Sequence, residues 1–466
     1  MHHEGRDSVA FGDGKEIEDN TTRLKVGEVT ISVFRVLYRY FISPDVHLQR
    51  WALQSMGSLF CRNPKLILTK AAEKVFSAAF NAPDVPLRAQ HLANIGEFLE
   101  SQADEMQVAE QLKKRKKDAD SGMSSALIQQ HLKSILLACL DKEESLRRHG
   151  MTIIQHTVNQ SFVAPFQCVP HLIALCSDPN TELQTTAFSL LQSVHEKRPE
   201  FCADMHAISG VWQAYNFRLR LSNMTEESMA MKLKDAFVGV KRLYQLLRPN
   251  RLRRMNFLQS LLNKIGSFHD EKTFGAQSLS FYIFLAQQVT NLPFAVREEP
   301  LFVVYTISHI LALHRDSILH ELSKEIEDGV EPTAGNKVKI NDAAAICVLI
   351  NIKHHLKEVH YLGDSVCEEF KPSVGSKAIE KNLPQWNERE DPVLNLQSVY
   401  PLLLDESPDT REAAYTLLKE LVDNDLHKDF EYDKGKKRRQ RTPAHGENST
   451  PGQSKTGEKK GRGSGA

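Results

Sequence analysis

The sequence contains no long run of apolar residues. Nowhere in its 466 residues is there a stretch of the eighteen or more apolar residues typical of a membrane-spanning helix. Residues 1–20 are polar and lack the apolar segment of a secretory signal peptide. The seven cysteines form no CxxC pair, and most lie in apolar helical stretches, where a buried free thiol is usual. These absences favour a protein of a reducing, intracellular compartment.

Motifs for catalysis and cofactor binding are also missing. There is no HExxH, no GxSxG, no Rossmann glycine set and no DxDxDG loop. The best metal candidates are His354, His355 and His360, but helix positions five apart point in different directions, so we interpret these histidines as surface or half-buried. The stretch GQSKTGEK resembles a phosphate loop, yet Glu458 stands where that motif needs lysine. We therefore expect no enzymatic activity, no cofactor and no metal site.

The charges are balanced in number but not in position. Lysines and arginines total 59, as do aspartates and glutamates, whereas the segment from Lys434 to the end holds ten basic residues against two acidic ones. A short basic run in this segment is typical of a nuclear localisation signal or a polyanion-binding patch, the alternative being a solubilising tail. The run consists of Lys436, Lys437, Arg438, Arg439 and Arg441. Phosphorylation at Thr442-Pro443 or Thr450-Pro451 would lower its net charge.

An internal repeat organises the first half of the chain. The segments PDVHLQRWALQSMGSL (from Pro44) and PDVPLRAQHLANIGEFL (from Pro83) align at an offset of 39 residues, and two further copies begin at Asp141 and Asp178. Each copy is typical of an apolar helix, a turn whose Asp caps the next helix, and a second helix. The period of about 40 residues is that of HEAT-type helical pairs.

Extended along the chain, this pattern predicts an all-α HEAT-repeat alpha-solenoid, a superhelix of helical pairs. We place the solenoid at residues 24–432, with a charged insert at 103–123 and loops at 325–341 and 368–393. Residues 1–23 and the basic tail 433–466 show no apolar periodicity and are predicted to be disordered. Leu301–Tyr305 has a composition suited to a strand, but helical spacing continues beyond it.

Four arginines stand between two apolar helical runs: Arg248, Arg251, Arg253 and Arg254. Pro249 suits the first position of the second helix, which places the arginines at a helix N-terminus, where the macrodipole disfavours cations. Because local helix stability does not explain these charges, we interpret the four arginines as a contact for DNA or an acidic partner. The alternative is solvated arginines whose stems cover a helix junction. Further basic candidates are Lys232, Lys234, Lys241, Arg242 and the run Lys113–Lys117.

The segment around these arginines resembles the C-terminal HEAT region of the Nipped-B-like (sister chromatid cohesion protein 2) cohesin-loader family. Its matching residues are Leu243, Tyr244, Arg248, Asn250, Arg251, Arg254, Phe257, Leu258, Ser260, Leu261 and Leu262. A second landmark consists of Phe294, Glu298, Glu299, Pro300, Leu301 and Phe302. The likeness extends from about Val26 to about Asn382, and Met255 departs from it by standing where a basic residue is expected.

The resemblance implies a nuclear, non-enzymatic protein that binds the cohesin complex through its SMC heads and kleisin, and also binds DNA. It implies that such a protein loads cohesin onto chromatin and stimulates the cohesin ATPase. A partner of the Scc4/MAU2-type TPR class is expected only for a longer protein with the family's N-terminal region. The alternative is a HEAT scaffold of the transport-receptor or phosphatase type that binds proteins and not DNA.

Overall fold

The structure, a computed structural model, is helical, as predicted from the sequence. It describes residues 21–111, 119–202, 204–222, 238–266, 279–329, 334–372, 394–404 and 408–439. The N-terminal half comprises α1 (Thr21–Phe41), α2 (Val46–Arg62), α3 (Lys70–Phe80), α4 (Val85–Gln111), α5 (Ala119–Cys139), α6 (Glu144–Asn159), α7 (Val169–Leu175), α8 (Thr181–Lys197) and α9 (Asp204–Ser222). The C-terminal half comprises α11 (Val238–Leu247), α12 (Arg251–Gly266), α13 (Leu279–Thr290), α14 (Glu298–Glu327), α15 (Ala334–Val359), α16 (Asp364–Glu369), α17 (Pro401–Leu404) and α18 (Pro408–Arg439).

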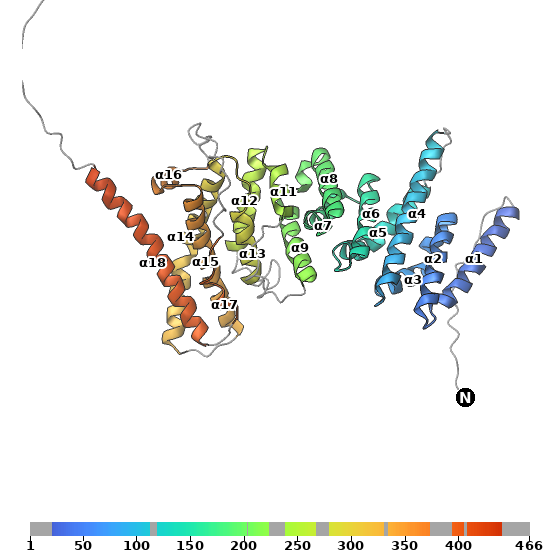
Figure 1. Ribbon diagram of the computed structural model, residues 1–466, viewed down its shortest axis with the longest axis horizontal. Coiled ribbons are helices and arrows are strands. Elements are labelled where there is room, and N and C mark those ends of the chain that lie inside the picture. The colour runs from blue at the N-terminus through green and yellow to red at the C-terminus, as the bar shows by residue number, and fades with distance from the viewer. Residues whose placement is uncertain are drawn as a thin grey trace, which may run out of the picture.

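The helices stand side by side in one elongated row, from α1 at one end to α14, α15 and α18 at the other (Figure 1). Consecutive layers pack on each other: α1 on α2, α2 on α4, α4 on α6 and α6 on α8. At the far end, α15 packs against α13, α14 and α18. The row has no single centre, so each layer buries its apolar faces against its neighbours, as in a solenoid. None of the described helices is apolar enough over a sufficient length to cross a membrane.

The repeated aspartate caps the second helix in the first two copies of the repeat, as the sequence predicts. The Asp45 carboxylate accepts hydrogen bonds from the backbone N–H groups of His47 and Leu48, at 2.8 and 3.4 Å. Asp84 accepts one from Leu87 at 2.9 Å. In the fourth copy the capping side chain is Asn180, which lies two residues after the aligned aspartate. These caps satisfy N–H groups that a helix start otherwise leaves without partners.

An arginine near the start of the second helix of a pair binds the aspartate of the following repeat. Arg50 lies 3.7 Å from the Asp84 carboxylate, and Arg88 lies 2.9 Å from Asp141. In the next step the Arg147 guanidinium donates two hydrogen bonds to Asp178, at 2.6 and 3.2 Å, and both side chains are buried. This ladder of ion pairs fixes the register between neighbouring layers, in addition to the apolar packing.

The core is continuous along the row. Rings of Phe34, Phe60 and Phe76 meet at 5.9 and 5.5 Å between centroids and link the first three helices. All seven cysteines are free thiols, and five of them are buried. The stretch Leu301–Tyr305 lies inside α14, in agreement with its helical spacing.

Several element boundaries differ from those expected. The charged insert 103–123 is largely helical, because α4 continues to Gln111 and α5 begins at Ala119. The loop expected at 325–341 is shorter, since α14 ends at Glu327 and α15 begins at Ala334, and Glu368 still belongs to α16. The physical reason is that Ala, Glu, Lys and Gln favour helix without an apolar stripe. Residues 1–20 and 373–393 lie outside the described residues.

Candidate functional site

The four arginines lie at the junction between α11 and α12, where a turn was predicted. Pro249 was expected to be the first residue of the second helix, which is wrong, because α12 begins at Arg251. Asn250 provides the reason: its side-chain oxygen accepts the backbone N–H of Arg253 at 3.1 Å and so caps the helix.

Two of the arginines bind backbone carbonyls of the turns. The Arg248 guanidinium donates to the carbonyl of Pro293, 3.1 Å away, in the turn before α14. The Arg254 guanidinium donates to the carbonyl of Arg248 at 2.8 Å. Both bonds satisfy oxygens at the ends of elements, where the helix ladder leaves carbonyls without partners. These arginines therefore stabilise the junction itself.

Arg251 and Arg254 also form ion pairs with the first turn of α14. Arg251 donates from Nε to Glu298 at 2.9 Å and also binds the carbonyl of Pro372 at 3.1 Å. The Arg254 guanidinium lies 3.5 Å from the Glu298 carboxylate and 3.3 Å from Glu299. The two carboxylates also suit the positive end of the α14 dipole. The arginines thus join three segments that are far apart in sequence.

Glu299 is the buried centre of this arrangement. Its side chain is fully buried and accepts backbone N–H groups of Ala295 at 2.6 Å and Val296 at 3.3 Å. Burial raises the pKa of Glu299, while the two N–H groups, Arg254 and Arg248 oppose that rise. Burial also raises the pKa of the neighbouring Tyr244 hydroxyl, and the Glu299 charge adds to the effect. The site holds a carboxylate in the core by surrounding it with donors.

Arg253 differs from the other three arginines. Within the described part of the chain, its guanidinium has no hydrogen-bond or ion-pair partner, and the side chain is partly exposed. It lies near His195 in the last turn of α8, where burial lowers the pKa of the imidazole and the Arg253 charge lowers it further. Among the described residues, Arg253 is therefore the arginine of this cluster whose guanidinium is not held by a carboxylate or a carbonyl of the chain.

The other basic candidates are only partly accounted for. Arg242 donates to the carbonyl and side chain of Gln184 at 3.3 and 3.2 Å, and its guanidinium lies 5.0 Å from the Phe188 ring centroid. Arg242 therefore contributes to packing between α11 and α8. Lys241 is partly exposed on α11, whereas Lys232, Lys234 and Lys113–Lys117 lie outside the described residues.

The basic run near the C-terminus continues a helix. The expected start of the disordered tail, residue 433, lies within α18, which extends to Arg439 and so includes Lys436, Lys437 and Arg438. Lysine and arginine favour helix once a helix has begun, which explains the extension. Arg441 and both threonines of the Thr-Pro pairs lie outside the described residues.

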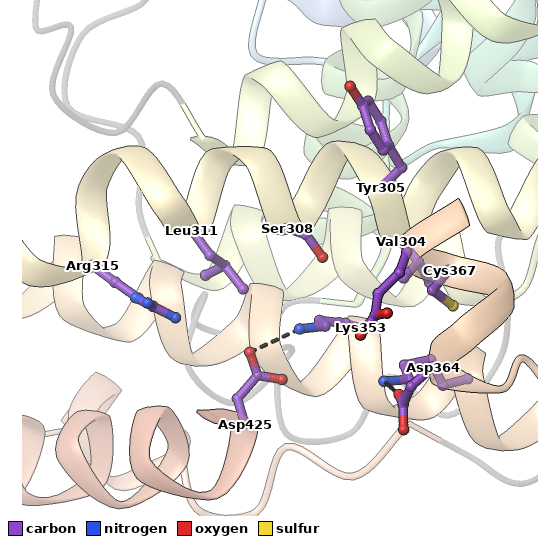
Figure 2. Close-up of a pocket in the computed structure, with 11 residues that line it drawn as sticks. Val304, Tyr305, Ser308, Leu311, Arg315, Lys353, Asp364, Cys367 and Asp425 are labelled. Carbon is purple, nitrogen blue, oxygen red and sulfur yellow. Dashed lines mark hydrogen bonds and ion pairs between the residues drawn. The ribbon is translucent and has the colours of Figure 1, made fainter. Parts of the chain in front are cut away.

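A cavity of about 400 Å³ lies among α14, α15, α16 and α18 (Figure 2). The Lys353 ammonium group and the His354 imidazole bind the Asp425 carboxylate of α18 from α15, at 2.8 and 2.9 Å. Burial raises the pKa of Asp425, but the bonds from His354 and Lys353 outweigh burial and lower that pKa to about 2. His354 therefore serves to attach α18. Among the described residues, no group of histidines, cysteines or carboxylates is arranged to hold a metal ion.

Sequence reasoning missed the carboxylates that bind the arginines. In the sequence, Glu298 and Glu299 belong to the second landmark, about forty residues after the first, and are typical of carboxylates at a helix start. In the structure the two landmarks meet, since Arg251 and Arg254 bind these glutamates and the Phe294 ring meets Tyr244 at 6.0 Å. The sequence signal for this contact is charge complementarity, with arginines at the α11–α12 junction and a pair of glutamates at the start of α14.

The fold and the site define a class, that of helical-repeat scaffold proteins. Comparison with known proteins then shows which family the chain resembles. Residues 124–310, which include the whole arginine junction and the first turn of α14, match the family model described as Sister chromatid cohesion C-terminus, Nipped-B type. The predicted resemblance is confirmed: this chain is related to the C-terminal region of Nipped-B-like proteins.

Relatives occur in distant organisms. The Nipped-B-like protein of Mus musculus is 24% identical over 430 residues, which covers 78% of this chain and 15% of the mouse protein. Nipped-B-like protein scc-2 of Caenorhabditis elegans is also 24% identical, covering 80% of this chain and 19% of its own length. The chain thus spans less than a fifth of these relatives.

A solved structure shares the fold. A C-terminal fragment of the Chaetomium thermophilum cohesin loader SCC2 superposes with a TM-score of 0.63 at 12% sequence identity. The match covers 85% of this chain and 27% of that fragment. At this identity the similarity shows the helical solenoid fold alone.

Proposed function

We propose that this chain is a cohesin-loading scaffold of the nucleus, which binds cohesin and DNA and stimulates ATP hydrolysis by the cohesin SMC heads. The observation that carries the proposal is the family match over residues 124–310, within which both landmark segments meet at one junction. The chain itself supplies no catalytic constellation in this proposal. Its contribution is to hold partners in one geometry along the helical row.

Within this proposal, Arg253 is the DNA or partner contact of the arginine cluster, and the half-exposed Arg251 is a secondary one. Arg248 and Arg254 stabilise the junction through their contacts with carbonyls and carboxylates of the chain. The run from Lys436 to Arg441 would provide the nuclear localisation signal. Arg253, beside other basic groups, would add salt-dependent affinity for phosphate. An Scc4/MAU2-type partner would require a longer protein.

The test is an ATPase assay with purified cohesin, DNA and this chain. The proposal expects the chain to bind cohesin and to raise DNA-dependent ATP turnover. Absence of both effects would reject it. Titrating DNA at graded salt adds a second measure, because phosphate contacts give a steep loss of affinity as salt increases.

One observation favours a second candidate, a HEAT scaffold that binds folded proteins without DNA. Three of the four arginines are engaged within the chain, which leaves few free cations at the junction. This candidate predicts cohesin or other protein binding with negligible DNA affinity at moderate salt. The same salt titration separates the two functions.

A further inference from the structure

A second cavity, of about 430 Å³, lies where the end of α8 meets the turn after α6. The short helices η2 (Pro165–Gln167) and η3 (Pro199–Cys202) each contribute one ring to its wall. We call this cavity the α8 pocket. Its volume is within the range of about 300–1,000 Å³ that is usual for ligand sites. The described residues that line it belong neither to the arginine junction nor to the cavity of Figure 2.

The floor of the α8 pocket is apolar. Val158 of α6 and Val194 of α8 line it and are 6% and 3% exposed. Pro165 and Phe201 form the wall, and the Phe201 ring is held by the Phe166 ring, 5.6 Å away between centroids. This floor suits a large apolar side chain of a ligand.

The rim of the α8 pocket is basic and rich in hydrogen-bond donors. It consists of Ser161, Ser193, Lys197 and Arg198, and no carboxylate is among the described lining residues. Within the described part of the chain, neither serine hydroxyl makes a hydrogen bond and Lys197 has no ion pair. Arg198 lies 3.5 Å from Glu200, but the two side chains are 68% and 57% exposed, and such solvated pairs are weak. The rim therefore offers positive charge and donors to a ligand.

Ser161 occupies a backbone position that favours glycine. It follows the end of α6 with a φ of 56°, in the left-handed region. The backbone N–H of Phe162 bonds the carbonyl of Thr157 at 3.1 Å, which is typical of a helix end whose next residue is a left-handed glycine. The fold does not need a side chain at this position, yet the serine hydroxyl lines the pocket. A ligand contact accounts for it.

Floor and rim together indicate the chemistry of the occupant. A DNA phosphate fits the cations but has no apolar group for the floor, whereas an uncharged apolar ligand leaves the rim unused. A segment of a polypeptide that carries a large apolar side chain beside a carboxylate matches both. Lys197 and Arg198 are exposed, so the pocket is open on their side and a chain can continue beyond it.

We propose that the α8 pocket binds a short acidic segment of a partner protein. A phenylalanine or leucine of the segment lies on the apolar floor, and an adjacent carboxylate binds Lys197, Arg198 and the Ser161 hydroxyl. This site is additional to the arginine junction and does not depend on DNA binding or on cohesin loading. An anchor of one side chain and one charge corresponds to a Kd of about 10–100 µM.

The test uses the full chain and three fluorescein-labelled peptides of about ten residues. The first peptide contains one phenylalanine flanked by glutamates, the second has glutamines in place of the glutamates, and the third has alanine in place of the phenylalanine. Fluorescence anisotropy is expected to show saturable binding of the first peptide. Binding of the second should be at least about fivefold weaker, and binding of the third at least about tenfold weaker.

Two variants test whether the first peptide lies in the pocket. Lys197→Gln/Arg198→Gln should weaken its binding at least about fivefold, since both charges of the rim are lost. Ser161→Gly should weaken it about threefold through loss of one hydrogen bond. Because glycine adopts a positive φ without a steric clash, Ser161→Gly should not lower the melting temperature. Loss of binding with the fold retained then reports on the hydroxyl.

The matched control is Arg62→Gln/Lys65→Gln. It removes two exposed cations from the end of α2, where a short helix that begins with proline also follows. This variant should bind the first peptide as the unmodified chain does. No saturable binding of the first peptide, equal binding of the first and second, or unchanged binding in both pocket variants would overturn the proposal. So would a loss of DNA affinity without a loss of peptide binding in Lys197→Gln/Arg198→Gln, since the rim would then serve nucleic acid.

Discussion

Replacing Arg253 and Arg254 by methionine, one at a time, should show which arginine of the junction stabilises the fold and which one binds DNA. Arg254 is 14% exposed and lies against two carboxylates, of which Glu299 is fully buried. Without Arg254, Glu299 keeps its two backbone donors but loses a nearby positive charge. The carbonyl of Arg248 also loses its hydrogen bond from the Arg254 guanidinium. Arg253 makes no such contacts in the described structure.

Breaking a buried ion pair by removing one partner costs about 3–5 kcal/mol. Because Glu298 retains Arg251 and Glu299 retains its backbone donors, we expect the lower end, about 3 kcal/mol, for Arg254→Met. Arg253→Met should leave stability unchanged, while it lowers affinity for DNA and reduces the slope of log affinity against log salt by about one.

The stability of each variant is best followed by urea denaturation together with hydrogen exchange of the backbone at residues 293–301. Exchange is needed because a row of repeats does not always unfold in a single step. Arg254→Met should accelerate exchange in this segment, and Arg253→Met should not. Equal destabilisation by both substitutions, or DNA affinity lost only with Arg254→Met, would refute the assignment of roles.

Three further predictions concern the solenoid. Arg147→Met should lower the free energy of unfolding by about 3–5 kcal/mol because it leaves the buried Asp178 carboxylate without its cation. Arg148→Met, at the neighbouring exposed arginine, should leave the urea midpoint unchanged. His91 is fully buried and its pKa is lowered from 6.5 to about 3 by burial and by a second histidine, so the folded state favours the neutral ring. Stability is thus retained above pH 6.5 and lost as the pH falls toward 3, and His91→Leu should flatten this dependence in acid denaturation curves. Gly150→Ala should lower the free energy of unfolding by about 1–3 kcal/mol and so lower the melting temperature, since a Cβ there would lie 2.6 Å from the sulfur of buried Cys139. An unchanged melting temperature would show that α6 shifts freely.

Local signals made the helical pairs predictable. The capping role of Asp45 and Asp84 follows from the residue type and from its position before an apolar helix, both of which are visible within a few residues. The ladder that joins the repeats was not predicted. Arg88 and Asp141 are 53 residues apart, and their contact depends on how one layer stacks on the next. Periodicity specifies which face is buried but not which residue of the next layer lies opposite.

The same limit applies to the candidate site. The position of the arginines in a turn was predictable from apolar spacing on both sides. Their partners were not, since Glu298 lies 47 residues from Arg251 and meets it only through packing of α12 on α14. The helix start was misplaced because Pro249 and Asn250 both favour a helix N-terminus, and only the observed side-chain hydrogen bond shows that Asn250 is the cap.

The meeting of the two landmark segments changes what the resemblance can mean for function. Arg251 and Arg254 on one landmark are bound to Glu298 and Glu299 on the other, so a sequence pattern that contains both describes a structural unit. A substitution that breaks this unit would disturb any activity of the solenoid through its fold, and loss of activity in such a variant would say little about DNA. Arg253 is not one of the matching residues, and among the described residues its guanidinium has no hydrogen-bond or ion-pair partner. A loss of DNA affinity on replacing Arg253, with stability retained, would therefore report on contact itself.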